Sequence, residues 1–96
     1  MSAGKSFEEY RAEYTKEPFA IPLPDGTAVE VPQHTIDTVL AIRAAAAADP
    51  GNKFAGLEIA VGAENAAKII EAWGKMPPAA WDALMADMRT AFGTKN

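Results

Sequence analysis

The stretch from Gly62 to Gly93 restricts the fold most, because its pattern is typical of two amphipathic helices joined by a tight turn. In each half, apolar residues recur three and four positions apart, which places them on one side of a helix. Gly74 and Gly93 stand where a left-handed residue ends a helix, and Pro78 suits a first helical turn. We therefore predict helices at 63–73 and 78–92. Their inward residues are expected to be Ala66, Ile69, Ile70 and Trp73 in the first and Trp81, Leu84, Met85, Met88 and Phe92 in the second.

The N-terminal part of the chain predicts one more helix with an aromatic side. Ser6 and Glu9 have the spacing of a capping box, so a helix over 6–16 is expected to start there. It should stop before Pro18, because proline disfavours helical backbone in the residue that precedes it. The aromatic residues of this helix fall on one stripe, which we interpret as docking the helix onto the body; a binding epitope is the alternative. The stripe consists of Phe7, Tyr10 and Tyr14.

The segment 19–31 carries the β signal of the chain. Apolar residues alternate with small or polar ones on both sides of Pro24-Asp25-Gly26. Proline presets a turn dihedral and glycine tolerates positive φ, so these three residues form a turn. We predict a short β-hairpin with one apolar face. A two-stranded hairpin is marginal alone, so that face must lie against helices or against another chain.

Two further helices are predicted between the hairpin and Gly62, at 35–48 and at 53–61. Thr35 is a plausible N-cap of the first. The alanine run at 44–48 is interpreted as helix propensity rather than as a smooth surface for close helix packing. The expected fold is thus mainly α: one domain over 1–96 with four to five helices and one short N-terminal β-hairpin. Inward residues are expected to be Ile36, Val39, Leu40 and Ala47 in the first helix and Phe54, Leu57 and Val61 in the second.

Composition and spacing argue against several function classes. A net charge of −4 with scattered lysines and arginines opposes binding to nucleic acid or to an anionic membrane. The charged start of the chain predicts no signal peptide, and the absence of cysteine suits a reducing cytoplasm. His34 is the one histidine, and we expect a surface or capping residue there. Without a base–nucleophile pair or a ligand cluster, we expect no enzyme, no cofactor and no metal site.

Apolar surface is the remaining candidate for function. Aromatic and methionine side chains recur at protein interfaces, and methionine adapts to irregular partners. The alternative is that these side chains form the core of the domain. The candidate partner-binding residues are Trp73, Trp81, Met85, Met88 and Phe92.

The order of features is similar to that of a known family. The segments that carry the similarity are SFEEYRAEY, EPFAIPLPDGTAVEVP, LEIAVGAENAAKIIEAWG and WDALMADMRTAFG, which together span about Ser6 to Gly93. This pattern resembles the tail assembly chaperones of long-tailed (siphovirus-type) actinobacterial phages. Its most specific parts are the segment 61–65 and the last helix. The high alanine content departs from the family, because it leaves fewer large apolar groups for a client surface.

The resemblance implies a non-enzymatic helper in the host cytoplasm. Such proteins bind the tape-measure protein, keep it soluble and recruit tail-tube subunits, and self-association is a further expectation. The tail at 93–96 is compatible with the frameshift that makes a longer second product in this family. Two alternatives stay open: a structural virion component, such as a connector or minor tail subunit, and a small helical protein-interaction adaptor.

Overall fold

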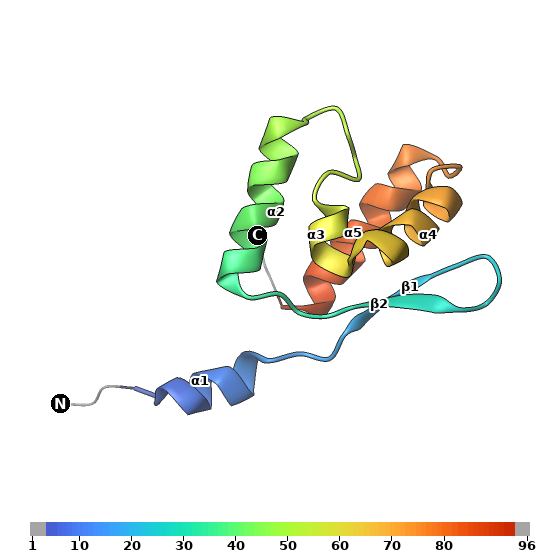
Figure 1. Cartoon of the computed structure of the whole chain (residues 1–96). Coiled ribbons are helices and arrows are strands. Elements are labelled where there is room, and N and C mark those ends of the chain that lie inside the picture. Colours follow the sequence, from blue (N-terminus) through green and yellow to red (C-terminus); the bar gives the residue numbers. More distant parts are fainter. Residues whose placement is uncertain (1–3, 94–96) are drawn as a thin grey trace.

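The computed structural model describes residues 4–93 and has five helices and one two-stranded sheet in that range (Figure 1). The mainly α fold class with a short hairpin near the N-terminus is confirmed. The tail residues 94–96, to which the frameshift expectation refers, lie outside the described residues. The elements in chain order are α1 (Phe7–Tyr14), β1 (Phe19–Pro22), β2 (Ala28–Val31), α2 (Ile36–Ala48), α3 (Leu57–Val61), α4 (Ala63–Trp73) and α5 (Pro78–Ala91).

The core lies between the apolar face of the hairpin and the helices α3, α4 and α5. The strands pair antiparallel with Phe19 opposite Val31, so alternate residues of both strands turn to the same side. Ile21 and Ile69 are the largest fully buried side chains. The hairpin therefore lies against helices, as its alternating pattern predicted. The buried residues are Ile21, Val29, Val31, Leu57, Ala66, Ile69, Trp81 and Leu84.

The turn of the hairpin is organised by Asp25. The Gly26 N–H donates to Leu23 O at 3.1 Å, and Gly26 has φ +90, as expected for a type I turn followed by a left-handed residue. The Asp25 carboxylate accepts bonds from Thr27 Oγ1 at 2.6 Å and from the Thr27 N–H at 2.9 Å. The bond from the Thr27 hydroxyl, followed by that from the Thr27 N–H, lowers the pKa of Asp25 below its ordinary value of 3.8.

This turn predicts a defined pH dependence. Because the pKa of Asp25 is lower in the folded than in the unfolded chain, its contribution to stability is present above pH 4 or so and is lost as pH falls through the folded pKa. Thr27→Val removes the hydroxyl donor, so the pKa of Asp25 should move up toward its ordinary value. A carboxyl-carbon NMR titration measures this shift. Thr90→Val, on α5, is the control and should leave it unchanged; an Asp25 pKa at or above the ordinary value in the wild type would contradict the prediction.

Most helix ends follow the predicted caps, and the exceptions have local causes. The capping box of Ser6 and Glu9 is formed, and Gly93 is left-handed with φ +74. The helix predicted over 53–61 begins only at Leu57, because Gly56 has φ +84 and interrupts the helical backbone. Gly74 was predicted to be left-handed, which is wrong: it has φ −64 and continues the helical turn.

The predicted inward face of α2 is wrong for three of its four residues, and Val39 alone of the four is half-buried. Ile36 is 79% exposed, Leu40 is 55% exposed and Ala47 is exposed. The half-buried side of α2 consists instead of Thr38, Val39, Ile42 and Ala45. Helix α2 packs on α3, and a Cβ on Gly56 would lie 2.8 Å from Ile42 Cγ2, so the closest approach is at Ile42. In α4, Ile70 is likewise 43% exposed, although its spacing placed it with the buried residues.

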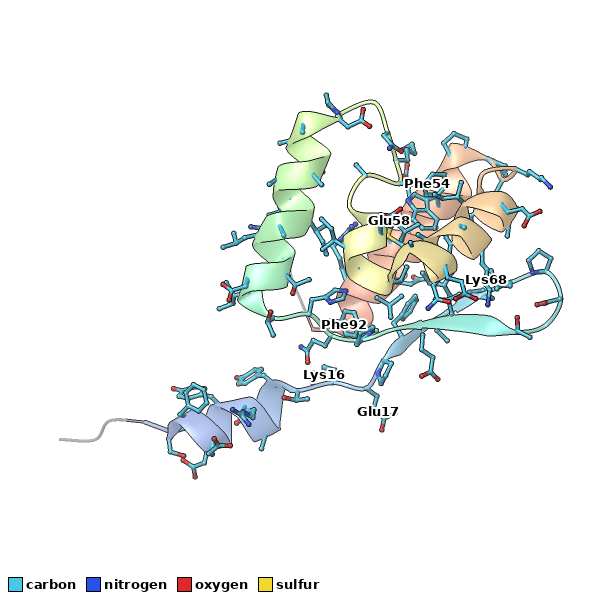
Figure 2. The ribbon with its side chains drawn as sticks, viewed as in Figure 1. Lys16, Glu17, Phe54, Glu58, Lys68 and Phe92 are labelled. Carbon is cyan, nitrogen blue, oxygen red and sulfur yellow. The ribbon has the colours of Figure 1, made fainter. Side chains whose placement is uncertain are left out.

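Helix α1 extends away from the rest of the molecule (Figure 1). None of its residues is buried, so the prediction that its aromatic stripe docks onto the body is wrong. The radius of gyration of 15.3 Å exceeds the roughly 12.5 Å expected of a compact chain of this length. Figure 2 shows Lys16 and Glu17 on the linker that separates α1 from the hairpin. The extended shape is thus due to an N-terminal arm.

Candidate protein-interaction surface

The aromatic residues among the predicted partner-binding set lie largely inside the molecule. Trp81 is 5% exposed and its ring stands edge-on to Phe54 and Trp73, at centroid distances of 4.9 and 5.9 Å. Trp73 is half-buried, and its Nε1 donates to Pro22 O at 2.9 Å, which ties α4 to β1. Figure 2 shows Phe54 between the turn before α3 and the helices α4 and α5. This aromatic cluster contributes packing to the core.

The other three predicted residues, Met85, Met88 and Phe92, are half-buried on α5 and just after it. Figure 2 places Phe92 close to the base of the hairpin. Met85 and Trp81 line a shallow groove of about 310 Å³ together with Lys53, Asp82 and Arg89. Lys53 Nζ lies 3.0 Å from Asp82 Oδ1, so an ion pair edges this groove. An apolar client would bind this groove weakly, because binding would remove water from the charged groups of Lys53 and Asp82.

One unpartnered apolar helix side belongs to α2. It is formed by residues at spacings of four, seven, eight and eleven, which lie on one side of a helix. We call it the α2 outer face. Arg43 is the one charged residue on it and makes no ion pair with any residue in the range 4–93. The α2 outer face consists of Ile36, Leu40, Arg43, Ala44 and Ala47, all of them exposed.

A second exposed apolar surface is the α1 aromatic stripe, formed by Phe7, Tyr10 and Tyr14, which are 73%, 50% and 56% exposed. The rings of Tyr10 and Tyr14 are stacked at 6.5 Å, and Lys5 Nζ lies 5.7 Å from the centroid of each. Arg11 lies over Phe7 at 5.4 Å. These cation–π contacts organise the stripe without covering it.

The remaining features of residues 4–93 concern a histidine, a second groove and the charged side chains. His34 is half-buried, and its Nε2 has no hydrogen-bond partner among the described residues. A groove of about 440 Å³ beside the hairpin turn is lined by Lys68, Glu71 and Lys75, whose charges are mixed. Residues 4–93 contain no group of three side chains that could hold a metal ion. None of the helices within 4–93 has the length and apolar character needed to cross a membrane.

The sequence analysis named the α1 stripe as a binding epitope only as an alternative, and it missed the exposed residues of α2 as a candidate surface. A signal was present in α2, where all of the thirteen residues except Asp37, Thr38 and Arg43 are apolar. A helix that is apolar on every side is typical of a protein interior. In this protein no residue of α2 is buried. Composition and environment therefore disagree, which makes the α2 outer face a candidate surface for a partner.

The fold and this surface define a small helical protein whose candidate site is an apolar docking face. No known protein family has a model that matches the chain, and no curated protein and no solved structure matches it either.

Proposed function

We propose that this chain is a non-enzymatic tail assembly chaperone of long-tailed actinobacterial phages, which binds the tape-measure protein in the host cytoplasm and aids assembly of the tail tube. The proposal is supported by one structural observation above all: ten of the thirteen residues of α2 are apolar, yet none of its residues is buried. A helix of that composition needs cover from another polypeptide.

The α2 outer face suits an amphipathic helix of the client. Ile36 and Leu40 provide large apolar groups, while Ala44 and Ala47 let a second helix approach closely. Recognition of a helix by its apolar side needs this combination of anchors and space. A tape-measure protein is long and helical, so many weak contacts along it add through avidity. The net charge of −4 opposes aggregation of the loaded complex.

A binding experiment tests this proposal. Leu40→Glu places a charge in the middle of the α2 outer face, and we expect at least tenfold weaker binding to a soluble tape-measure fragment. Burial of the exposed half of a leucine is worth about 1–1.5 kcal/mol, and a desolvated carboxylate adds to that loss. Isothermal titration calorimetry measures the affinity, and circular dichroism should show the helix content of the wild type, because Leu40 is 55% exposed and its replacement removes no core contact.

Met76→Glu is the matched control, since Met76 is 46% exposed and lies in the turn between α4 and α5. It should bind like the wild type. Co-expression with the tape-measure protein should also raise the soluble fraction of the client. Wild-type affinity of Leu40→Glu, or a client that is no more soluble with this chain than without it, would count against the proposal. Stoichiometric amounts of the chain in finished virions would favour a structural component instead.

A further inference from the structure

We propose that the α1 aromatic stripe of one copy binds the α2 outer face of a second copy, and that two copies exchange these arms reciprocally. The inference rests on the proposed function in one respect, because it names what occupies the α2 outer face before the tape-measure protein does. The occupant is itself a short helix with an apolar stripe, which is the kind of ligand that this face is proposed to accept.

The build of α1 points to a partner in another molecule. The helix has eight residues, and helices this short are marginal in water unless they pack against something. None of its residues is buried in its own chain. Its C-terminal end is held by Gln33, whose Oε1 accepts from the Lys16 N–H at 2.8 Å and whose Nε2 donates to Tyr14 O at 3.0 Å. These bonds fix the direction of α1 away from its own α2 (Figure 1).

The two surfaces complement each other in size and charge. Two of the five residues of the α2 outer face, Ala44 and Ala47, are alanine, so the bulky rings of α1 find small groups opposite them. The sequence of α1 between Phe7 and Tyr14 includes three carboxylates and one guanidinium, whereas Arg43 is the one charged residue of the α2 outer face. In its own chain Glu9 accepts from the Ser6 N–H and Glu13 pairs with Lys5, whereas Glu8 lies 3.8 Å from Arg11 Nε and is the most loosely held of the three carboxylates. Glu8 can therefore turn to Arg43 of the second copy, which makes no ion pair within residues 4–93 of its own chain.

The available area matches what a stable dimer needs. The three rings of α1 expose on the order of 350 Å². Ile36 and Leu40 add on the order of 150 Å² of apolar side chain. Each copy contributes both of these apolar areas, one from its arm and one from its α2 outer face. If they make up about 60% of the interface, each copy buries about 800 Å² in total, which is the standard size for a specific complex. A single arm supplies only part of this area, so the exchange has to be reciprocal, and a two-fold dimer results because the same two surfaces are used twice.

Sedimentation equilibrium on the full chain, without any client, tests the exchange. The wild type should form a dimer of two 10.2-kDa chains. The arm variant Phe7→Ser/Tyr14→Ser and the face variant Leu40→Glu should each be monomeric. An equimolar mixture of the two variants retains one intact arm–face contact, so it should form a heterodimer with a dissociation constant at least tenfold weaker than that of the wild-type dimer. Met76→Glu should remain a dimer.

The two variants also separate the exchange from other dimers. An arm variant that stays dimeric would show a contact between two α2 faces, and a face variant that stays dimeric would show a contact between two arms; either result overturns the proposal, as does a monomeric wild type. Circular dichroism checks folding, and Ile36→Glu replaces Leu40→Glu if that variant unfolds.

Failure of this inference is distinguishable from failure of the proposed function. The arm variant leaves the α2 outer face unoccupied, so it should bind the tape-measure fragment at least as tightly as the wild type does. A monomeric wild type that still binds the fragment through Leu40 would overturn only the arm exchange. A dimer with the predicted variant pattern that ignores the fragment would overturn only the chaperone role.

Discussion

Replacing Trp81 by alanine should lower the free energy of unfolding by about 3–5 kcal/mol, the range typical of a buried tryptophan. Its side chain is 5% exposed and contacts both Phe54 and Trp73 edge-on, so the truncation leaves a cavity and removes two aromatic contacts. A domain of this size has a total stability of roughly 5–14 kcal/mol. The variant should therefore be close to unfolding, and urea titration followed by circular dichroism measures the loss.

Met76→Ala is the control for this truncation. Met76 is 46% exposed in the turn between α4 and α5, outside both proposed binding surfaces, and the loss should stay within about 0.5 kcal/mol. A different outcome would change the role of Trp81. Trp81→Ala could instead keep wild-type stability and lose affinity for the tape-measure fragment. That result would support Trp81 as a partner-binding residue and would show that its packing in the core contributes little to stability.

The elements of this fold were predictable wherever a short sequence pattern is typical of a single local structure. The Ser6–Glu9 capping box, the Pro24-Asp25-Gly26 turn and the apolar spacing of α4 and α5 each depend on neighbouring residues only. All of these elements formed. The start of α3 was the element boundary that the sequence did not determine. A glycine in a short helical pattern, such as Gly56, is compatible either with a helix or with a left-handed residue that ends a turn.

The orientation of α2 could not be predicted, because its sequence has no polar side. Ten apolar residues out of thirteen leave no periodic contrast that would distinguish an inward from an outward face. The side that packs is set by the approach of Gly56 to Ile42, which is a contact between separate elements. Helix α1 illustrates the same limit, since the spacing of Phe7, Tyr10 and Tyr14 identifies a stripe but not the molecule that covers it.

The exposure of the predicted partner-binding residues could not be derived from the sequence for a related reason. Large apolar residues at helical spacing are typical of cores and of interfaces alike. In α5 that pattern belongs mainly to the core, as Trp81 and Leu84 are buried. Only the position of the neighbouring elements distinguishes the two uses. The α2 outer face is identified by an apolar composition together with solvent exposure. A sequence alone provides the composition but not the exposure.

Gly56→Ala should lower the free energy of unfolding by about 2–5 kcal/mol, because glycine meets two requirements at this position. Its φ of +84 is left-handed, which costs a residue with a Cβ about 1–2 kcal/mol. The new Cβ would also lie 2.8 Å from Ile42 Cγ2 and 3.1 Å from Ile42 O, and such overpacking typically costs about 1–3 kcal/mol. Thermal unfolding monitored by circular dichroism measures the sum.

Gly26→Ala separates the two contributions. Gly26 has φ +90, and a Cβ added to it would meet no atom within 4 Å, so its substitution should cost only the backbone part, about 1–2 kcal/mol. Equal losses in the two variants would show that the approach of Ile42 is not tight. Helix α2 packs on α3 next to Gly56, so the new Cβ should displace α2 in the Gly56→Ala molecules that remain folded. Their affinity for the tape-measure fragment should then fall, although Gly56 itself is not part of the α2 outer face.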